Sequence, residues 1–434
     1  MTKRQIFNTF YVCAIEVVCF VAFLPIACIL RLKKRRKIIQ NMNIFIGINE
    51  IAGNLYKIES AFKEYGAQTY STAIRNSYYP NYVYSDEITD TASKLNIFGG
   101  LVDINCMRHL GYLFFCIKST YKICFKYDMA FFDWNLSFFI FNLDWLLFKI
   151  SGIKVLVMHC GDDVRYRPIH NKIQEEIYGS GAVTLPATPD LSTKYYFLAK
   201  LVAQKTAEWF SNFLLTVDDD NINRKQTFLQ KNAYGISQPQ EILIAKPKKV
   251  NEIITILHAP SDRKNKGTDD TVLPAIKALQ DEGFSFNFEL IENKPNEYVL
   301  ERLKNADIVI DNPHRMGNLS REALASSCYI ITGEMNVNSM WQDCPYWIFK
   351  TQDITRMKQG IAECLNNKPL LEQKMQQSWN FANTLLSNHA FCNKIQNVLK
   401  GAMLPEVKPL VNQKKLCLKY AGNYWEKFWI LLLM

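Results

Sequence analysis

The segment from residue 253 to residue 268, IITILHAPSDRKNKGT, constrains the fold of this chain more than any other. An apolar, β-rich run ends there at a polar turn that contains Arg263 and Lys266, and a helical pattern begins near Thr271. A strand that leads into a helix is the unit of a parallel α/β sheet, and the helix N-terminus at its carboxyl edge binds phosphates. Pro274 fits the first helical turn, where its missing N–H removes no bond. The segment predicts a diphosphate site, with a solvated loop carrying ordinary surface cations as the alternative.

Strand-like runs alternate with helix-length segments on both sides of a proline- and lysine-rich stretch, residues 236 to 251. The runs cover residues 43–48, 129–132, 155–159, 213–217, 253–257, 286–292, 306–311 and 329–332. Such alternation predicts a parallel sheet in each half, and 434 residues suffice for two Rossmann-sized domains. We expect a leader at 1–37, an N-terminal domain at 38–240, a C-terminal domain at 241–405 and a tail at 406–434.

The formal net charge of +10 is concentrated at the start of the chain. Residues 1 to 37 contain eight lysines and arginines and one glutamate, so the remainder is nearly balanced. We therefore do not expect a nucleic-acid partner. The cysteines form no CxxC or Cys/His ligand spacing, which indicates reduced and mostly buried thiols rather than a metal site.

The leader is apolar from Ile6 to Leu30 and continues directly into RLKKRRK at residues 31 to 37. This pattern indicates a membrane anchor with the following chain on the cytoplasmic face, since basic residues favour that side. Glu16 and Pro25 interrupt the apolar run, so a transmembrane span, a re-entrant or interfacial helix, and a soluble helix packed on the body all remain open. The tail, residues 416 to 434, is rich in tryptophan and leucine and could meet a membrane or pack back onto the first domain.

Residues 306 to 332, ADIVIDNPHRMGNLSREALASSCYIIT, contain a short strand, a glycine turn and a helix entered through Glu322. Together with the Lys266-Gly267 pair, this segment resembles the donor half of retaining GT-B glycosyltransferases, family-four-like (glycosyl transferases group 1), which act in bacterial surface polysaccharide biosynthesis. The resemblance covers most of residues 43 to 400. It implies two Rossmann-like domains whose parallel sheets face a cleft.

The resemblance assigns donor binding to six residues and places Glu322 on the donor ribose. These donor residues are Arg263, Lys266, Gly267, Gly317, Asn318 and Glu322. A carboxylate near a helix N-terminus can accept two hydroxyl hydrogen bonds there. The alternative is that Glu322 only stabilises its helix, for which Asn318 would be the N-cap.

In the N-terminal half, residues 127 to 168 resemble the central cleft segment of the same enzymes. His159, at the end of a strand, would face the donor sugar and join Arg263 and Lys266 as a catalytic residue. Gly53, Asp162 and Arg165 would lie on the acceptor side. Asp162 and Arg165 could equally form a structural pair with each other.

Two features depart from the pattern. His314 stands where many relatives carry a sugar-binding glutamate, and Arg263 is closer to Lys266 than the usual arginine. The run Asp218-Asp219-Asp220 is not assigned to a metal, because cations and helix dipoles replace the metal in GT-B folds. We expect no metal and no cofactor beyond the nucleotide sugar.

These features predict a retaining, metal-independent hexosyltransferase on the cytoplasmic face of the cell membrane, in a bacterium the inner membrane. It would transfer a sugar from a nucleotide diphosphate to a glycan, with a lipid-linked acceptor expected. Two other functions remain open. One is a non-catalytic GT-B scaffold of a glycan-assembly complex, which His314 favours, and the other is a nucleotide-sugar epimerase, against which the anchor argues.

Overall fold

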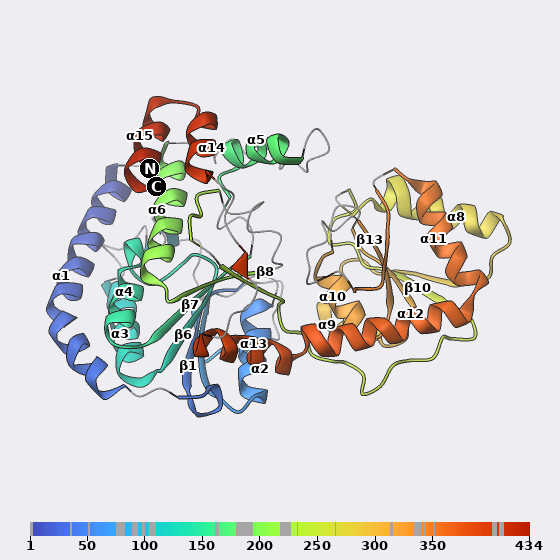
Figure 1. The fold of residues 1–434 in the computed structure, drawn as a ribbon, viewed down its shortest axis with the longest axis horizontal. Coiled ribbons are helices and arrows are strands. Elements are labelled where there is room, and N and C mark those ends of the chain that lie inside the picture. The colour runs from blue at the N-terminus through green and yellow to red at the C-terminus, as the bar shows by residue number, and fades with distance from the viewer. Residues whose placement is uncertain are drawn as a thin grey trace. The chain divides into compact units, whose positions relative to one another are not determined.

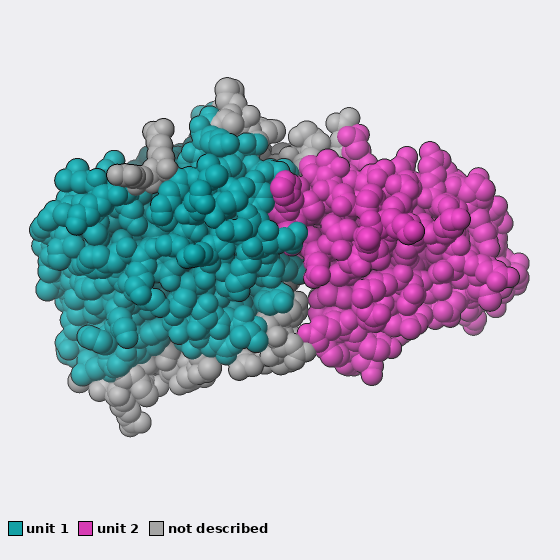
Figure 2. Space-filling view, turned by 90° about the horizontal axis from the view of Figure 1, so that it is seen from below, with its two compact units in different colours: residues 1–237, 392–434 teal, residues 238–391 magenta. Residues whose placement is uncertain are grey.

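The fold is described from a computed structural model, drawn in Figure 1. It describes residues 3–34, 37–50, 53–74, 83–88, 94–97, 100–103, 110–160, 165–178, 194–217, 227–231, 233–264, 266–312, 316–333, 341, 343–350, 352–401, 406–407 and 412–434. The chain forms two compact units. Unit 1 comprises Met1–Ser237 and Cys392–Met434, and unit 2 comprises Gln238–Phe391 (Figure 2).

The main sheet of unit 1 has the strand order β15-β9-β8-β7-β6-β1-β2-β3. Its strands are β1 (Asn43–Asn49), β2 (Gln68–Ile74), β3 (Asp86–Ile88), β6 (Met129–Asp133), β7 (Lys154–His159), β8 (Phe213–Val217), β9 (Ala233–Ile236) and β15 (Glu406–Val407). All neighbours are parallel except β15, which runs antiparallel to β9. A separate antiparallel pair joins β4 (Lys94–Ile97) and β5 (Gly100–Asp103). The four strands predicted in this half are confirmed as β1, β6, β7 and β8.

Helices cover the sheet of unit 1. They are α1 (Lys3–Lys33), α2 (Asn54–Glu64), α3 (Leu110–Lys126), α4 (Leu143–Ile150), α5 (Arg167–Tyr178), α6 (Lys194–Phe210), α13 (Asn388–Lys400), α14 (Gln413–Tyr420) and α15 (Tyr424–Leu433), with 3₁₀ turns η1 (Ile39–Asn41) and η2 (Ile140–Asn142). Under α4, Phe132 of β6 lies 5.1 Å from Trp145, measured between ring centroids, and stacks on Phe148. These rings belong to a core of fully buried aromatic and aliphatic side chains, which fastens α4 to β6 and β7.

The long apolar helix predicted at the N-terminus is present as α1. It lies along α3 and α4, with Val12, Glu16, Phe23 and Ala27 buried on the contacting face (Figure 1). Among the described residues it is the one helix long and apolar enough to cross a membrane, yet only 22% of its apolar window is buried within the protein. Its outward face is therefore apolar as well. The exposed large side chains on α1 are Phe7, Phe10, Tyr11, Val17, Val18, Val21, Ile26, Ile29 and Leu32.

Glu16 does not face away from the protein. Its Oε2 accepts a hydrogen bond of 2.9 Å from the backbone N–H of Ile140, the first residue of η2. Burial raises the pKa of its carboxyl well above the usual range, against the lowering effect of that hydrogen bond. The carboxylate within the apolar leader is thus explained by its contact with η2, inside unit 1.

Unit 2 contains a wholly parallel sheet in the order β11-β10-β12-β13-β14. Its elements are β10 (Thr255–His258), η5 (a π-helical turn, Thr268–Val272), α8 (Leu273–Asp281), β11 (Asn287–Leu290), α9 (Asn296–Leu303), β12 (Ile308–Ile310), α10 (Asn318–Ala325), β13 (Tyr329–Thr332), β14 (Tyr346–Ile348), α11 (Ile354–Asn366), α12 (Lys368–Phe381) and η6 (a second π-helical turn, Ala382–Leu386). Val309 packs into one core, and its neighbours Ile308 and Ile310 pack into another. Because strand side chains alternate, β12 is buried on both faces.

The chain leaves unit 1 at Ser237, just before the predicted boundary at 240/241, and returns to it at Cys392, well before residue 405. Most of α13 therefore belongs to unit 1 and not to the C-terminal domain. The cause lies in long-range contacts. The Tyr65 hydroxyl donates to Asn393 Oδ1, and the Ile39 N–H donates to Gln396 Oε1 at 2.8 Å.

The C-terminal tail packs back onto unit 1. Ile430 of α15 is buried with Tyr166 and Phe197, and the Tyr166 hydroxyl donates to Glu426 Oε1 at 2.9 Å. Other large side chains of α15 point outward, and these are Tyr424, Trp425, Phe428, Leu431 and Leu432. Of the two roles expected for the tail, packing onto the first domain is observed.

Candidate functional site

The loop after β10 lies where a parallel sheet binds ligands. From β10 the chain passes to β11 on one side and then to β12 on the other, so the gap between β10 and β12 is a topological switch point. Gly267, with a φ of 64°, precedes η5, which continues directly into α8. The helix thus begins at Thr268, slightly before the predicted start, and Pro274 lies in the first turn of α8. The predicted strand–turn–helix unit is present.

A salt bridge spans this switch point. Lys266 Nζ lies 2.6 Å from Oδ1 of Asp311, the residue directly after β12, and the Lys266 side chain is 15% exposed while that of Asp311 is fully buried. Oδ2 of Asp311 accepts hydrogen bonds from the Gly317 N–H at 2.8 Å and from the Ser320 hydroxyl at 2.6 Å. Asp311 therefore ties the loop after β10 to the start of α10.

Burial by itself would raise the pKa of the Asp311 carboxyl. The Lys266 ammonium and the hydrogen bonds from Lys266, Ser320 and Gly317 outweigh burial and hold the pKa below its ordinary value. The carboxylate is accordingly ionised at neutral pH. Because an ammonium has three N–H donors and Asp311 engages one side of it, Lys266 retains donors for an anion at the carboxyl edge.

The prediction that Asn318 is the N-cap of the donor-side helix is wrong. Asn318 is the first residue of α10, and the N-cap is Gly317, which makes no side-chain cap of its own. The Asn318 side chain instead accepts a hydrogen bond of 3.1 Å from Arg321. A Cβ on Gly317 would lie 2.8 Å from Asp311 Oδ2, so glycine is required for the carboxylate to reach the helix N-terminus.

Arg263 is held by two carboxylates. Its guanidinium pairs with Asp269 in the first turn of η5 and donates to Glu292 at 2.8 and 2.9 Å. The hydrogen bonds that Arg263 donates to Asp269, and then those to Glu292, raise the pKa of its guanidinium. Arg263 and Lys266 thus both lie at the β10 edge, but Arg263 already bridges two acidic groups, and an anion there would have to compete with them.

His258, the last residue of β10, positions this loop. Its Nδ1 lies 2.8 Å from the Ile310 carbonyl oxygen and its Nε2 lies 2.8 Å from Thr268 Oγ1. A carbonyl only accepts, so Nδ1 carries the proton and Nε2 accepts from the Thr268 hydroxyl. Burial lowers the pKa of His258 to about 4, which keeps the imidazole neutral.

Glu322 lies in α10 and is buried. Its Oε1 is 3.4 Å from Asn296 Nδ2, at the start of α9. Its assignment to a donor ribose stays a prediction. His314 lies outside the described residues.

In unit 1 the corresponding switch point lies between β1 and β6. Gly53 follows β1, has a φ of 78° and is the N-cap of α2. His159 is the last residue of β7 and is buried, as is Arg165, which precedes α5. Asp162 and the Asp218-Asp219-Asp220 run lie outside the described residues.

Glu50, directly after β1, was not predicted as a site residue. It is buried, and the Tyr84 hydroxyl donates to its Oε2. Burial raises the pKa of this carboxyl, while hydrogen bonds from Tyr84 and from backbone N–H groups at the start of α2, including those of Gly53 and Asn54, oppose the rise. A carboxylate of the protein itself thus lies at the N-terminus of α2.

Sequence reasoning missed Glu50, His258 and Asp311. All three share one signal, which is a polar residue at the carboxyl end of an apolar strand run. Glu50 follows residues 46–49 (IGIN), and Asp311 follows residues 308–310 (IVI). That position places a side chain at the ligand-binding edge of a parallel sheet.

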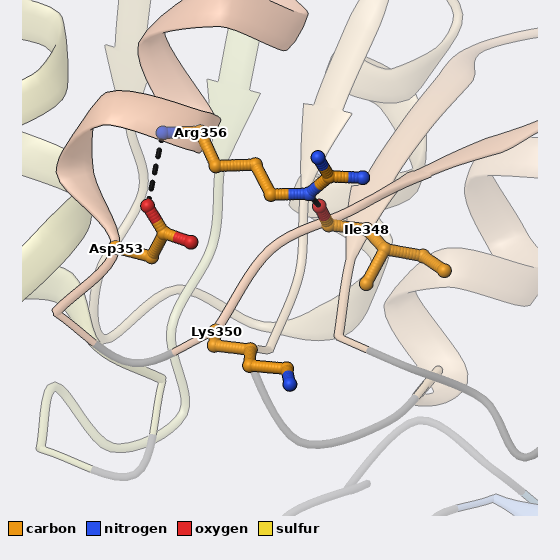
Figure 3. A pocket seen from close by; sticks show the side chains of 4 residues that line it. All are labelled: Ile348, Lys350, Asp353 and Arg356. Atoms are coloured by element: carbon orange, nitrogen blue, oxygen red, sulfur yellow. Dashed lines mark hydrogen bonds between the residues drawn. The ribbon is translucent and has the colours of Figure 1, made fainter.

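A small cavity of about 340 Å³ lies beyond the edge strand β14 and is lined by Ile348, Lys350, Asp353 and Arg356 (Figure 3). Asp353 caps α11 by accepting from the Arg356 N–H at 3.0 Å, and Arg356 Nε donates to the Ile348 carbonyl oxygen at 2.8 Å. These bonds are local to the start of α11. The cavity includes no predicted donor residue.

Two parallel α/β domains in one chain, each with polar side chains at its switch point, constitute the GT-B glycosyltransferase fold, as predicted. No protein-family model and no curated protein matches this sequence. Solved structures do match its fold. A sucrose-phosphate synthase from Thermosynechococcus elongatus is similar at a TM-score of 0.50 and 10% identity, over 83% of this chain and 98% of that one.

HepE from Anabaena, in complex with UDP and glucose, is similar at a TM-score of 0.51 and 10% identity, over 83% of this chain and 100% of that one. An α-glucosyltransferase in complex with UDP and a 13-mer DNA is similar at a TM-score of 0.50 and 11% identity, over 83% and 99%. At such identities the likeness concerns the fold alone.

Proposed function

We propose that this protein is a glycosyltransferase that moves a sugar from a nucleotide diphosphate donor to a glycan acceptor. The observation that carries the proposal is the Lys266–Asp311 pair, which holds a cation at the switch point of unit 2 within a GT-B fold. Two of the similar structures contain UDP, which supports a uridine diphosphate sugar as the first donor to test.

Lys266 would bind the donor diphosphate with the donors that Asp311 leaves available. Arg263 would add a second cation once the diphosphate displaces Asp269 or Glu292. As the bond between the anomeric carbon and the diphosphate breaks, negative charge grows on the leaving oxygen. Preorganised cations that meet this charge lower the barrier. Glu322 would accept hydrogen bonds from the ribose hydroxyls.

We further propose that the configuration of the sugar is retained. The acceptor oxygen would bond to the anomeric carbon on the face that the diphosphate leaves, and the acceptor proton would pass to the departing diphosphate. Lys266, Arg263 and the start of η5 supply the positive charge for this reaction, so we propose that no metal takes part. Within the described part of the chain, no group of three or more His, Cys, Asp or Glu side chains is placed to hold a metal ion.

For the acceptor we propose a lipid-linked glycan at the cytoplasmic face of a membrane, in a bacterium the inner membrane. Support comes from α1, whose outward face is apolar along its length while the opposite face packs on α3 and α4. A helix fastened lengthwise to a domain is suited to lie in the membrane surface rather than to cross it. Confinement to that surface would raise the effective concentration of a lipid-linked acceptor.

The proposal is tested by incubating the detergent-solubilised protein with uridine, guanosine and thymidine diphosphate sugars plus lipid extract, and recording release of the nucleotide diphosphate. Lys266→Met and Glu322→Gln should each lower release from the accepted donor by roughly 100-fold or more. Lys264→Ala, which removes an exposed cation from the same loop, is the matched control and should release normally. Equal release by all four proteins would contradict the assignment of the site.

A non-catalytic scaffold is the second candidate, and the acidic surroundings of Arg263 favour it. Asp269 and Asp270 lie in the first turn of η5, and both Asp269 and Glu292 engage the guanidinium. Asp269 and Glu292 thereby occupy the guanidinium of Arg263, one of the two cations that the donor diphosphate would need. Calorimetric titration with UDP decides between the two functions, because a scaffold would show no binding, whereas a transferase binds UDP and loses that binding in Lys266→Met.

A further inference from the structure

A cavity of about 850 Å³ lies in unit 1 at the amino edge of its large sheet. Met42, Asp128, Lys154 and Phe213 line it, and each of them immediately precedes or begins one of the strands β1, β6, β7 and β8. Ligands of α/β sheets bind at the carboxyl edge, so this cavity is separate from the candidate donor and acceptor residues. Its lining includes Arg31 near the end of α1 and Met42 just before β1.

The lining of the cavity is strongly basic. Its cationic residues are Arg31, Lys34, Lys37, Lys149, Lys154 and Lys400, and its single carboxylate is Asp128. Lys37 pairs with Asp128 at 2.9 Å, and the same Asp128 oxygen accepts from the Asn43 N–H at 3.0 Å. That carboxylate is therefore already engaged and leaves most of the positive charge unbalanced.

Three of the cations are available to a ligand. Lys34 donates to the Tyr127 carbonyl oxygen, and Lys149 donates to the carbonyl oxygens of Trp209 and Ser211. By contrast, the head groups of Arg31, Lys154 and Lys400 make no hydrogen bond or ion pair with any residue in the described part of the chain.

The walls of the cavity are fixed by contacts between distant parts of the chain. Ile39 is held by Gln396 of α13, as noted above, and Gly152, in the turn before β7, has a φ of +86°. A Cβ on Gly152 would come within 3.3 Å of the Lys34 side chain, so glycine lets the basic segment approach that turn. The Lys34 side chain is half-buried, and this burial lowers the pKa of its ammonium.

We propose that this cavity binds the phosphate of an anionic membrane lipid and so sets the depth and orientation of unit 1 on the membrane. The inference rests on the proposed membrane association of α1 and adds a specific headgroup site to it. Ile29 and Leu32, exposed on the last turns of α1, adjoin Arg31, so the apolar face leads directly to the cavity. A lipid whose chains lie along α1 would place its phosphate among Arg31, Lys154 and Lys400, where a guanidinium can bind two phosphate oxygens.

The test uses the full-length protein and vesicle co-sedimentation. One set of vesicles contains phosphatidylcholine alone, and the other also contains phosphatidylglycerol. The variant is the double substitution Lys154→Gln and Lys400→Gln, which removes two exposed cations without breaking a described contact. The matched control is Lys172→Gln with Lys277→Gln, which removes the same charge from exposed positions on α5 and α8.

Wild-type protein should partition more strongly onto the anionic vesicles. The cavity variant should lose about 30-fold in that partitioning, since each cation near an anionic surface contributes roughly a factor of five. The control should keep it. Equal losses in the variant and the control would overturn the cavity site and leave only a general attraction of positive charge.

Three further outcomes separate the cavity from the proposals on which it builds. If wild type and variant bind both vesicle types equally well, α1 associates with membranes and the headgroup site is refuted. If millimolar inorganic phosphate releases the protein from the anionic vesicles, and does so even when the apolar face of α1 is not engaged, the site takes a free anion. The lipid assignment is then overturned. Absence of any vesicle binding would refute the membrane association itself, while the transferase proposal would still be decided by nucleotide release.

Discussion

Replacing Lys266 by methionine removes the ammonium that neutralises the buried Asp311 carboxylate while it keeps a side chain of similar length. The carboxylate would retain its hydrogen bonds from Gly317 and Ser320 but lose its only ion pair among the described residues. Loss of one partner of a buried pair costs about 3–5 kcal/mol. Since Lys266 is partly exposed and Asp311 keeps other donors, we expect the low end, about 3 kcal/mol.

The sign of the pH dependence distinguishes this cause from lost packing. In the wild type the pKa of Asp311 is lowered, so its contribution to stability is full above the unfolded value and is lost as the pH falls through the folded value. Without Lys266, burial dominates and raises the pKa. The variant should then be most destabilised at pH 8 and should recover part of the loss as the pH falls toward 5.

Hydrogen exchange of peptides from β12 and α10 is the appropriate assay, because it reports on unit 2 alone. Lys266→Met should weaken protection there, and Lys264→Met, in the same loop, should not. Adding Asp311→Asn to Lys266→Met should restore about 2 kcal/mol, since the amide keeps an acceptor for Gly317 without a charge. A loss below about 1 kcal/mol that is the same at pH 5 and pH 8 would refute the reasoning.

Three other substitutions test individual contacts, two in unit 2 and one in unit 1. Gly317→Ala should destabilise unit 2 by about 1–3 kcal/mol in thermal melting, because the new Cβ meets the Asp311 carboxylate, whereas Gly111→Ala, with open space around it, should not. Because the pKa of His258 is about 4 in the folded protein and about 6.5 in the unfolded chain, urea unfolding should show stability falling by about 3 kcal/mol from pH 6.5 to pH 4. His258→Gln should remove that slope, and an unchanged slope would mean that another group titrates. Glu16→Leu should lower stability by about 1–3 kcal/mol by leaving a buried N–H without an acceptor, whereas Glu16→Gln should be nearly neutral; equal effects would count against the hydrogen bond.

Much of the fold follows from local sequence alone. The runs at β1, β6, β8 and β13 are short, apolar and bounded by turns, and they form strands at nearly the predicted residues. Apolar periodicity and turn glycines such as Gly267 act over a few residues, so they can be read without knowledge of the fold. The long apolar helix at the N-terminus is of the same kind.

Tertiary structure decided what these elements do. Asp311 owes its partners to the loop after β10, and the Glu16 carboxylate meets a backbone N–H from a segment more than a hundred residues away. The strands β2, β3 and β14 went unpredicted, as did the return of α13 to unit 1, because pairing and packing with other segments of the chain create them. Local sequence therefore determined the two series of strands and helices. Contacts between residues far apart in the chain decided which side chains became buried partners, which cations line a cavity and which apolar face points outward. The local sequence pattern does not specify these contacts.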